Sequence, residues 1–213
     1  TTASNNTAVG YQAGYTFAST GTGPITAFGY QAGYSNNTAD PRMTAIGYQA
    51  LYTHNGGTQE NTAVGWRAAY LTTTGSALVS IGNESLYNNT TGTQQVAIGY
   101  QALTANTTGS SNVAIGWRSL FSNTTASNNT AVGYQAAYSQ TTAGGDGGNT
   151  AIGYQSLYAN TNYRNTAVGY VSAQYVTGSG NVAVGWGALT GVSGSSSGGS
   201  NIGIGYQALT NNT

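Results

Sequence analysis

Charged side chains are the first place to look for chemistry, and this chain has only eight, four Arg and four acidic residues. Cleavage of a glycoside needs two carboxylates within roughly 5–9.5 Å of each other. Asp40 and Asp146 fall in distant parts of the chain, and only Asp40 and Glu60 come from neighbouring segments. No pair of acids is therefore predicted to act on a substrate, and we do not expect an enzyme.

The charges fit a structural role better. The chain repeats itself about every eighteen residues, and in that frame Glu60 occupies the position that Arg42 holds one repeat earlier. Glu84 stands in the same relation to Arg67. If successive repeats stack, each acid lies next to an Arg in the adjacent layer. We predict two salt bridges between layers, Arg42–Glu60 and Arg67–Glu84.

Metal and cofactor chemistry finds no support in the sequence. His54 is the single histidine, so it lacks the partners of a metal site and is expected in a surface turn. Calcium-binding β-rolls need Asp in every repeat, and the chain has two. The Gly-rich segments are followed by no Lys, so they do not resemble a phosphate loop. We expect no cofactor.

Aromatic side chains recur in two columns, one residue and five residues after a repeated Gly. Stacked aromatic rings can pack in a core or between chains, and they can also bind sugar rings. We favour packing for the first column and leave both readings open for the second. The candidates for glycan stacking in the second column are Tyr15, Tyr34, Tyr52, Tyr70, Tyr87, Tyr138 and Tyr158.

Amide side chains form two further columns, Gln two residues after the Gly and Asn four residues before it. Amide ladders stabilise stacked parallel strands, so we predict a structural role for them. Asn also occurs in sequons for N-glycosylation, most of them in segments of variable length where a glycan would face solvent. The candidate sites are Asn5, Asn36, Asn83, Asn88, Asn89, Asn106, Asn123, Asn128 and Asn211.

The repeat that positions these columns has a short alternating core, as in Asn-Thr-Ala-Val-Gly-Tyr, typical of a β-strand. Its Gly returns twelve times at intervals of 16 to 20 residues: Gly10, Gly29, Gly47, Gly65, Gly82, Gly99, Gly116, Gly133, Gly153, Gly169, Gly185 and Gly205. Such a period is one coil of a solenoid. We predict an all-β fold, a parallel β-solenoid (β-roll) of about twelve coils with one or two strands each and a thin interior of Ala, Ser and Gly.

Composition excludes several classes of function. The net charge is zero and 4% of residues are charged, so there is no basic stripe for nucleic acid. The chain contains no run of about 18 apolar residues, so no membrane-spanning segment is predicted. Residues 1–213 form a single repeat domain without terminal caps, and we expect it to be a segment or subunit of a longer fibre.

Asn-Thr-Ala-Val-Gly-Tyr-Gln-Ala and Val-Ala-Ile-Gly-Trp-Arg-Ser resemble the head repeats of YadA-like trimeric autotransporter adhesins and related repeats of bacteriophage tail fibres. The resemblance covers nearly the whole chain. It implies a left-handed parallel β-roll, usually trimeric, that displays a binding surface outside the cell. The repeats of this chain are longer and more aromatic, and no functional residue is carried over.

Two functions follow as expectations. The first is an extracellular structural subunit of a fibre or appendage, which assembles end to end with copies of itself. Its surface is a candidate for coating by glycans. The second is a carbohydrate- or receptor-binding adhesin head or tail-fibre shaft, a homotrimer on a cell surface or virion, with surface glycans as candidate partners. A third, more distant reading is ice binding by a Thr face, although Val and Ile interrupt the Thr column.

Overall fold

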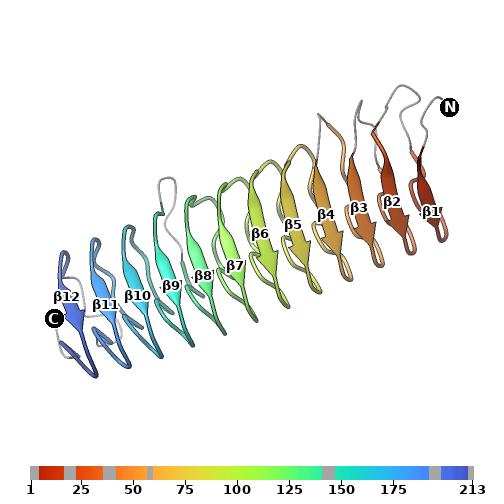
Figure 1. Ribbon diagram of the computed structural model, residues 1–213. Helices are drawn as coiled ribbons and strands as arrows, with labels where there is room; N and C mark the ends of the chain where they lie inside the picture. Colours follow the sequence, from red (N-terminus) through yellow and green to blue (C-terminus); the bar gives the residue numbers. More distant parts are fainter. Residues whose placement is uncertain are drawn as a thin grey trace.

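The structure is a computed structural model of the 213-residue chain, described here for residues 5–16, 23–35, 42–56, 60–140, 147–191 and 198–210. The predictions at Asn36 and Asn211 fall outside these ranges. The predicted parallel β-solenoid is confirmed: the described residues contain twelve strands and no helix, arranged side by side along a rod (Figure 1). One strand is present in each coil, and coil numbers below follow the strand numbers.

The strands are three or four residues long and pair in chain order, in parallel, in a single sheet. They are β1 (Thr7–Val9), β2 (Ile25–Phe28), β3 (Met43–Ile46), β4 (Asn61–Val64), β5 (Leu78–Ile81), β6 (Gln95–Ile98), β7 (Val113–Ile115), β8 (Thr130–Val132), β9 (Thr150–Ile152), β10 (Thr166–Val168), β11 (Val182–Val184) and β12 (Ile202–Ile204). The register keeps every column aligned, so that Ala97 pairs with Ala114 and Ile98 with Ile115.

The period-two pattern of each strand decides which side chains enter the core. In β6, Gln95 and Ala97 are buried, whereas Val96 and Ile98 are partly exposed. Each strand is followed by the repeated Gly, whose backbone enters a left-handed region, with φ 132° at Gly116. A Cβ built at Gly116 would lie 2.3 Å from the carbonyl oxygen of Gly133 in the next coil. Gly is therefore required by both backbone conformation and close approach.

The turn after the Gly carries a feature that the sequence does not predict. Two further positions of each coil adopt the left-handed conformation, and most of them are not Gly, as at Gln101 (φ 54°) and Leu103 (φ 52°). Their N–H groups are bonded across coils, Gln101 to the carbonyl of Asn83 and Leu103 to that of Ser119. Bonds to both neighbouring coils hold a conformation that costs non-Gly residues about 1–3 kcal/mol.

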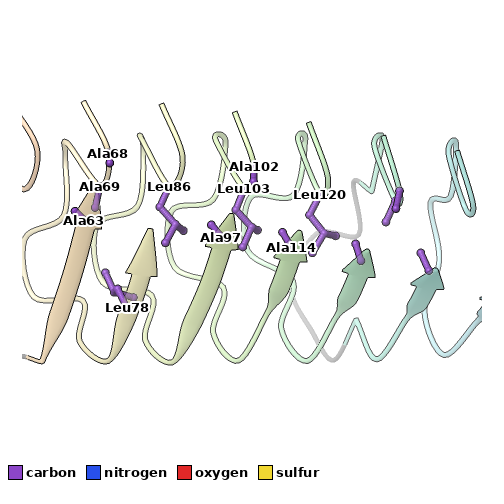
Figure 2. Close-up of a cluster of buried hydrophobic side chains, with 14 of the residues drawn as sticks. Ala63, Ala68, Ala69, Leu78, Leu86, Ala97, Ala102, Leu103, Ala114 and Leu120 are labelled. Carbon is purple, nitrogen blue, oxygen red and sulfur yellow. The ribbon is translucent and has the colours of Figure 1, made fainter. Parts of the chain in front are cut away.

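The core is a narrow layer of Ala with one Leu column (Figure 2). In coils 2–11 the Ala or Ser two before and three after the Gly are buried, as the thin-interior prediction requires. The larger side chains, including Leu86, Leu103 and Leu120, lie four after the Gly and are fully buried. The rings of the first aromatic column lie outside the core of the single rod, so of the two kinds of packing predicted for them only packing between chains stays a prediction.

Two rows of amides complete the interior. In the row four before the Gly, Asn129 Oδ1 accepts the backbone N–H of Asn149 at 3.1 Å, and Asn149 Oδ1 accepts that of Asn165 at 2.8 Å. In the second row, seven after the Gly, Asn106 Nδ2 donates to Asn89 Oδ1 at 2.9 Å and Asn123 Nδ2 to Asn106 Oδ1 at 3.1 Å. The predicted structural role of the Asn ladder is confirmed, and the second row was not predicted.

His54 belongs to this second row and is fully buried, so its predicted place in a surface turn is wrong. Its Nε2 lies 3.0 Å from Asn61 Nδ2. Asn61 Oδ1 accepts the N–H of Leu78 at 3.0 Å, which orients the amide so that Nδ2 donates to the imidazole. His54 therefore replaces an interior amide of the ladder.

Candidate functional site

The outer surface of the rod carries two parallel aromatic ladders, and they are the main candidates for function. The first ladder lies one residue after the Gly and stacks with ring centroids 4.8–6.3 Å apart. Its rings are exposed, for example Tyr100 at 40% and Trp186 at 44%. The second ladder, five after the Gly, stacks at 4.9–5.3 Å and is mostly half-buried.

Stacking along the rod restricts glycan binding. The planes of neighbouring rings in the second ladder lie within 5–14° of parallel, so inside the ladder each ring covers the faces of its neighbours. A sugar stacks on the face of a ring, and only rings at the end of a row keep one open. Of the seven predicted glycan-stacking residues, Tyr34, Tyr52 and Tyr70 have neighbours on both faces, and so does Tyr138. Tyr15, Tyr87 and Tyr158 end their rows.

A row of amides and Arg side chains runs between the two ladders. Gln31 Nε2 donates to Gln12 Oε1 at 2.9 Å, and Gln49 Nε2 donates to Gln31 Oε1 at 2.9 Å. Arg118 Nε continues the pattern with a bond of 2.7 Å to Gln101 Oε1. Its guanidinium carbon also lies 4.4 Å from the ring centre of Trp117, within cation–π distance. The row is directional, because each of these donors points to the preceding coil.

The two predicted salt bridges have different outcomes. Arg42 Nη1 lies 2.6 Å from Glu60 Oε1, and both side chains are more than half exposed. Such a pair contributes about 0–1 kcal/mol. Arg67 does not pair with Glu84: its Nε donates instead to Gln49 Oε1 at 3.0 Å. Glu84 Oε2 accepts from Gln101 Nε2 at 2.7 Å. The prediction for this second pair is corrected, because the donors of the row point toward the preceding coil.

The sequons fall into two groups. Asn89, Asn106 and Asn123 are fully buried, and their Nδ2 atoms donate hydrogen bonds inside the rod, so the folded chain has no room for a glycan there. The prediction is corrected for these three, because they form the second interior amide row. Asn5, Asn83 and Asn128 are exposed. Asn88 is half-buried, and its Nδ2 donates to the carbonyl of Thr104 at 3.0 Å.

Within the described ranges, no three His, Asp or Glu side chains gather into a group that could hold a metal ion. The structure also has, among the residues it describes, no helix with the length and hydropathy of a membrane span. The Asp40 and Asp146 side chains lie outside these ranges.

Ionisation of the second ladder gives a testable pH dependence. Burial raises the pKa of Tyr52 above its ordinary value of 10.0, and Tyr34 and Tyr70 add to the effect. Burial likewise raises the pKa of Tyr158, with Tyr138 contributing. A folded-state pKa above the unfolded value gives stability that is complete below that unfolded value and is lost as pH rises through the folded one. We therefore expect the free energy of unfolding to fall as pH rises above about 10.

Circular dichroism during an alkaline titration measures this loss. The double variant Tyr52→Phe with Tyr158→Phe keeps both rings and removes both ionisable groups, so its unfolding midpoint should move to higher pH. An unchanged midpoint would show that other groups cause alkaline unfolding.

Comparisons of this chain with protein-family models, with curated proteins and with solved structures find no match.

Proposed function

We propose that this chain is a structural segment of an extracellular fibre or appendage, extended by stacking further coils of the same kind on its ends. The observation that carries the proposal is the direction of the bonding. The twelve strands pair only with their neighbours in order, and the amide rows run along the same axis. Each coil forms hydrogen bonds with the coils before and after it, so the repeat itself does not limit the number of coils in the fibre.

The two ends of the described rod complement each other. Gln12 accepts from Gln31 and keeps its Nε2 as a donor, whereas Gln207 keeps its Oε1 as an acceptor at the other end. Tyr11 and Tyr206 are the corresponding terminal rings of the first ladder. A head-to-tail contact of this kind does not close on itself and generates filaments. The next coil can come from the same polypeptide or from another copy.

The surface is consistent with this role. It has few charges, and its polarity comes mainly from Thr, Ser, Asn and Gln. We assign glycosylation to the exposed sequons Asn5 and Asn128, where an attached glycan would extend into solvent.

Electron cryo-microscopy of the native assembly tests the proposal. The expected result is continuous filaments with an axial repeat of about 4.8 Å, the spacing of paired strands. A dispersed, stable monomer under native conditions would refute end-to-end assembly.

A second function is favoured by a separate observation, the apolar column just before the Gly. Phe28, Ile46, Ile81, Ile115 and Ile152 are 36–55% exposed along one side of the rod. Continuous exposed apolar surface marks contact sites, so lateral packing of rods into a homotrimeric adhesin head or tail-fibre shaft is the alternative. Discrete rods with a three-fold axis in the same micrographs would support it over the filament.

A further inference from the structure

The first aromatic ladder has one interruption, at coil 5. Eleven coils carry Tyr or Trp at this position, and coil 5 carries Asn83. The flanking rings, Trp66 and Tyr100, are stacked on their outer sides only, by Tyr48 at 6.3 Å and by Trp117 at 5.9 Å. Two coil spacings separate Trp66 from Tyr100, about 9.6 Å. A ring placed midway would lie about 4.8 Å from each, the ordinary spacing of stacked strands.

No described side chain fills this interruption. Asn83 is exposed, Trp66 is 39% exposed and Tyr100 is 40% exposed. The guanidinium of Arg67 lies 4.5 Å from the Trp66 ring centre, but its Nε is bonded to Gln49 in coil 3, on the side away from coil 5. The faces of Trp66 and Tyr100 that look toward coil 5 are covered by no other described ring.

The second ladder breaks one coil later, at Thr104. Tyr87 stacks on Tyr70 and Phe121 stacks on Tyr138, and Thr104 stands between them. Thr104 Oγ1 donates to the carbonyl of Glu84 at 2.6 Å, which ties this position to coil 5. Tyr87 thus keeps one face that no other ring covers, whereas the guanidinium carbon of Arg118 lies 5.1 Å from the ring centre of Phe121.

The polar row between the ladders breaks at the same level. Arg67 donates toward coil 3, and Glu84 accepts from Gln101 in coil 6, so no hydrogen bond joins Arg67 to Glu84. Glu84 Oε2 is used by Gln101, and Oε1 has no hydrogen-bond partner among the described residues. A carboxylate oxygen, the Asn83 amide and open aromatic faces therefore meet on coils 4–6.

We propose that this ladder gap, made of Trp66, Asn83, Glu84, Tyr100 and Thr104, is a binding site for one pyranose ring of a carbohydrate. The ring would lie between Trp66 and Tyr100, with its C–H faces against the two π-systems. Its hydroxyl groups would donate to Glu84 Oε1 and exchange hydrogen bonds with the Asn83 amide. A ligand with a flat body and a polar edge matches these groups better than a wholly apolar aromatic, which would leave the amide and carboxylate unmatched.

The hollow beside Gly187 is one of several on the described surface, and it lacks this combination. It has a volume of about 380 Å³ beside Gly187, and its aromatic wall is Trp186. Trp186 is stacked by Tyr170 at 5.9 Å and by Tyr206 at 5.0 Å. Both faces are covered, so that hollow offers a sugar no open ring face. Coil 5 is distinguished by open faces together with polar groups.

NMR of the intact chain tests the site with methyl β-glucoside, methyl β-galactoside, methyl α-mannoside and N-acetylglucosamine as probes. The indole N–H signals of Trp66, Trp117 and Trp186 report separately on three places along the rod. We expect at least one of these sugars to shift the Trp66 signal saturably and to leave that of Trp186 unchanged. If none of the four shifts the Trp66 signal, or if p-cresol does so and the sugars do not, the carbohydrate assignment is overturned.

The decisive variant is Asn83→Tyr, which fills the gap with the residue type of the other coils. We expect a thermal midpoint equal to or above that of the parent and a loss of sugar affinity of about tenfold or more. Val171→Gln is the control, because it completes the polar row far from the gap and should leave binding unchanged. Unchanged sugar binding in Asn83→Tyr would refute the site. The result does not depend on whether the rods form filaments.

Discussion

We expect Gly116→Ala to break the stack between β7 and β8. The new Cβ would lie 2.3 Å from the carbonyl oxygen and 2.7 Å from the carbonyl carbon of Gly133, and both atoms belong to backbone. The coils cannot move apart there, because Gly116 N–H donates to Ile98 and Gly133 N–H to Ile115, both at 2.8 Å. Backbone strain at φ 132° adds to the clash. We expect a loss of about 4 kcal/mol or more.

Hydrogen exchange measures where this loss falls. In a solenoid, stability is a sum of coil and nearest-neighbour terms, so coils 7 and 8 should lose protection first and the outer coils least. Global unfolding in denaturant should move to a lower midpoint at the same time.

In a single rod, where no further coil stacks on coil 12, Gly205→Ala is the matched control for this variant. Gly205 also has a positive φ, 123°, but a Cβ built there meets nothing within 4 Å. The Gly205→Ala substitution therefore introduces backbone strain without a clash, and it should lower the free energy of unfolding by about 1–3 kcal/mol. Equal destabilisation by the two substitutions would mean that strain, and not the close approach of coils, makes the Gly necessary.

The sequence predicts this fold well because every coil repeats the same constraints. The alternation in segments such as Gln95–Ile98 places small residues inward, and the recurrent Gly marks where two backbones meet. A column shared by twelve coils averages out the local exceptions that mislead a prediction from one segment. The register of the sheet follows once the Gly residues are aligned.

The candidate site was harder to predict, for physical reasons. Which way the rings at positions such as Tyr100 and Tyr87 face depends on the left-handed turn at Gln101 and Leu103, and neither residue type signals a positive φ. Once the turn is known, the inward column is Leu and the rings stack outside. The functional information then lies in the exceptions, Asn83 and Thr104, which an analysis of shared columns treats as noise.

The second interior amide row has a signal in the sequence, but its Asn residues also match the N-glycosylation motif. Asn89, Asn106 and Asn123 each lie seven residues after the repeated Gly. Each is also the Asn of a sequon, with Thr two residues later, and the sequon by itself predicts a surface position. Their constant separation of seven residues from the repeated Gly, and not the sequon motif, indicates that they are buried. The same distance also applies to His54.

We expect Asn165→Ala to be the second most damaging substitution. Asn165 is fully buried, and its Oδ1 accepts the backbone N–H of Asn181 at 2.8 Å and the side-chain Nδ2 of Asn181 at 3.0 Å. Its Nδ2 donates to the carbonyl of Gly178 at 2.9 Å. Alanine removes the hydrogen-bond partner of the Asn181 N–H, the Asn181 Nδ2 and the Gly178 carbonyl. Each buried polar group left unsatisfied costs about 1–3 kcal/mol. We expect a loss of about 3 kcal/mol in denaturant unfolding.

Two further variants separate the hydrogen bonds from the loss of an Asn side chain as such. Asn55→Ala removes an exposed Asn for which no side-chain hydrogen bond is found, and it should change stability by less than about 0.5 kcal/mol. Asn165→Gln should be milder than alanine, because coil 6 already carries Gln95 at the equivalent position. Gln95 Oε1 accepts the N–H of Asn112 at 3.1 Å, and its Nε2 donates to the carbonyl of Gly109.

Apolar residues at the same position in other coils show why Asn165→Ala should destabilise the rod more than a substitution by a large apolar residue. Ile25, Met43 and Leu78 occupy this position in coils 2, 3 and 5 and are buried there, so the column accepts a large apolar side chain that fills the space. Alanine neither fills the space nor bonds to the next coil, so it combines a cavity with unsatisfied polar groups. Asn165→Leu should therefore fall between glutamine and alanine. If leucine and alanine were equally damaging, the hydrogen bonds alone would account for the stability that this row supplies.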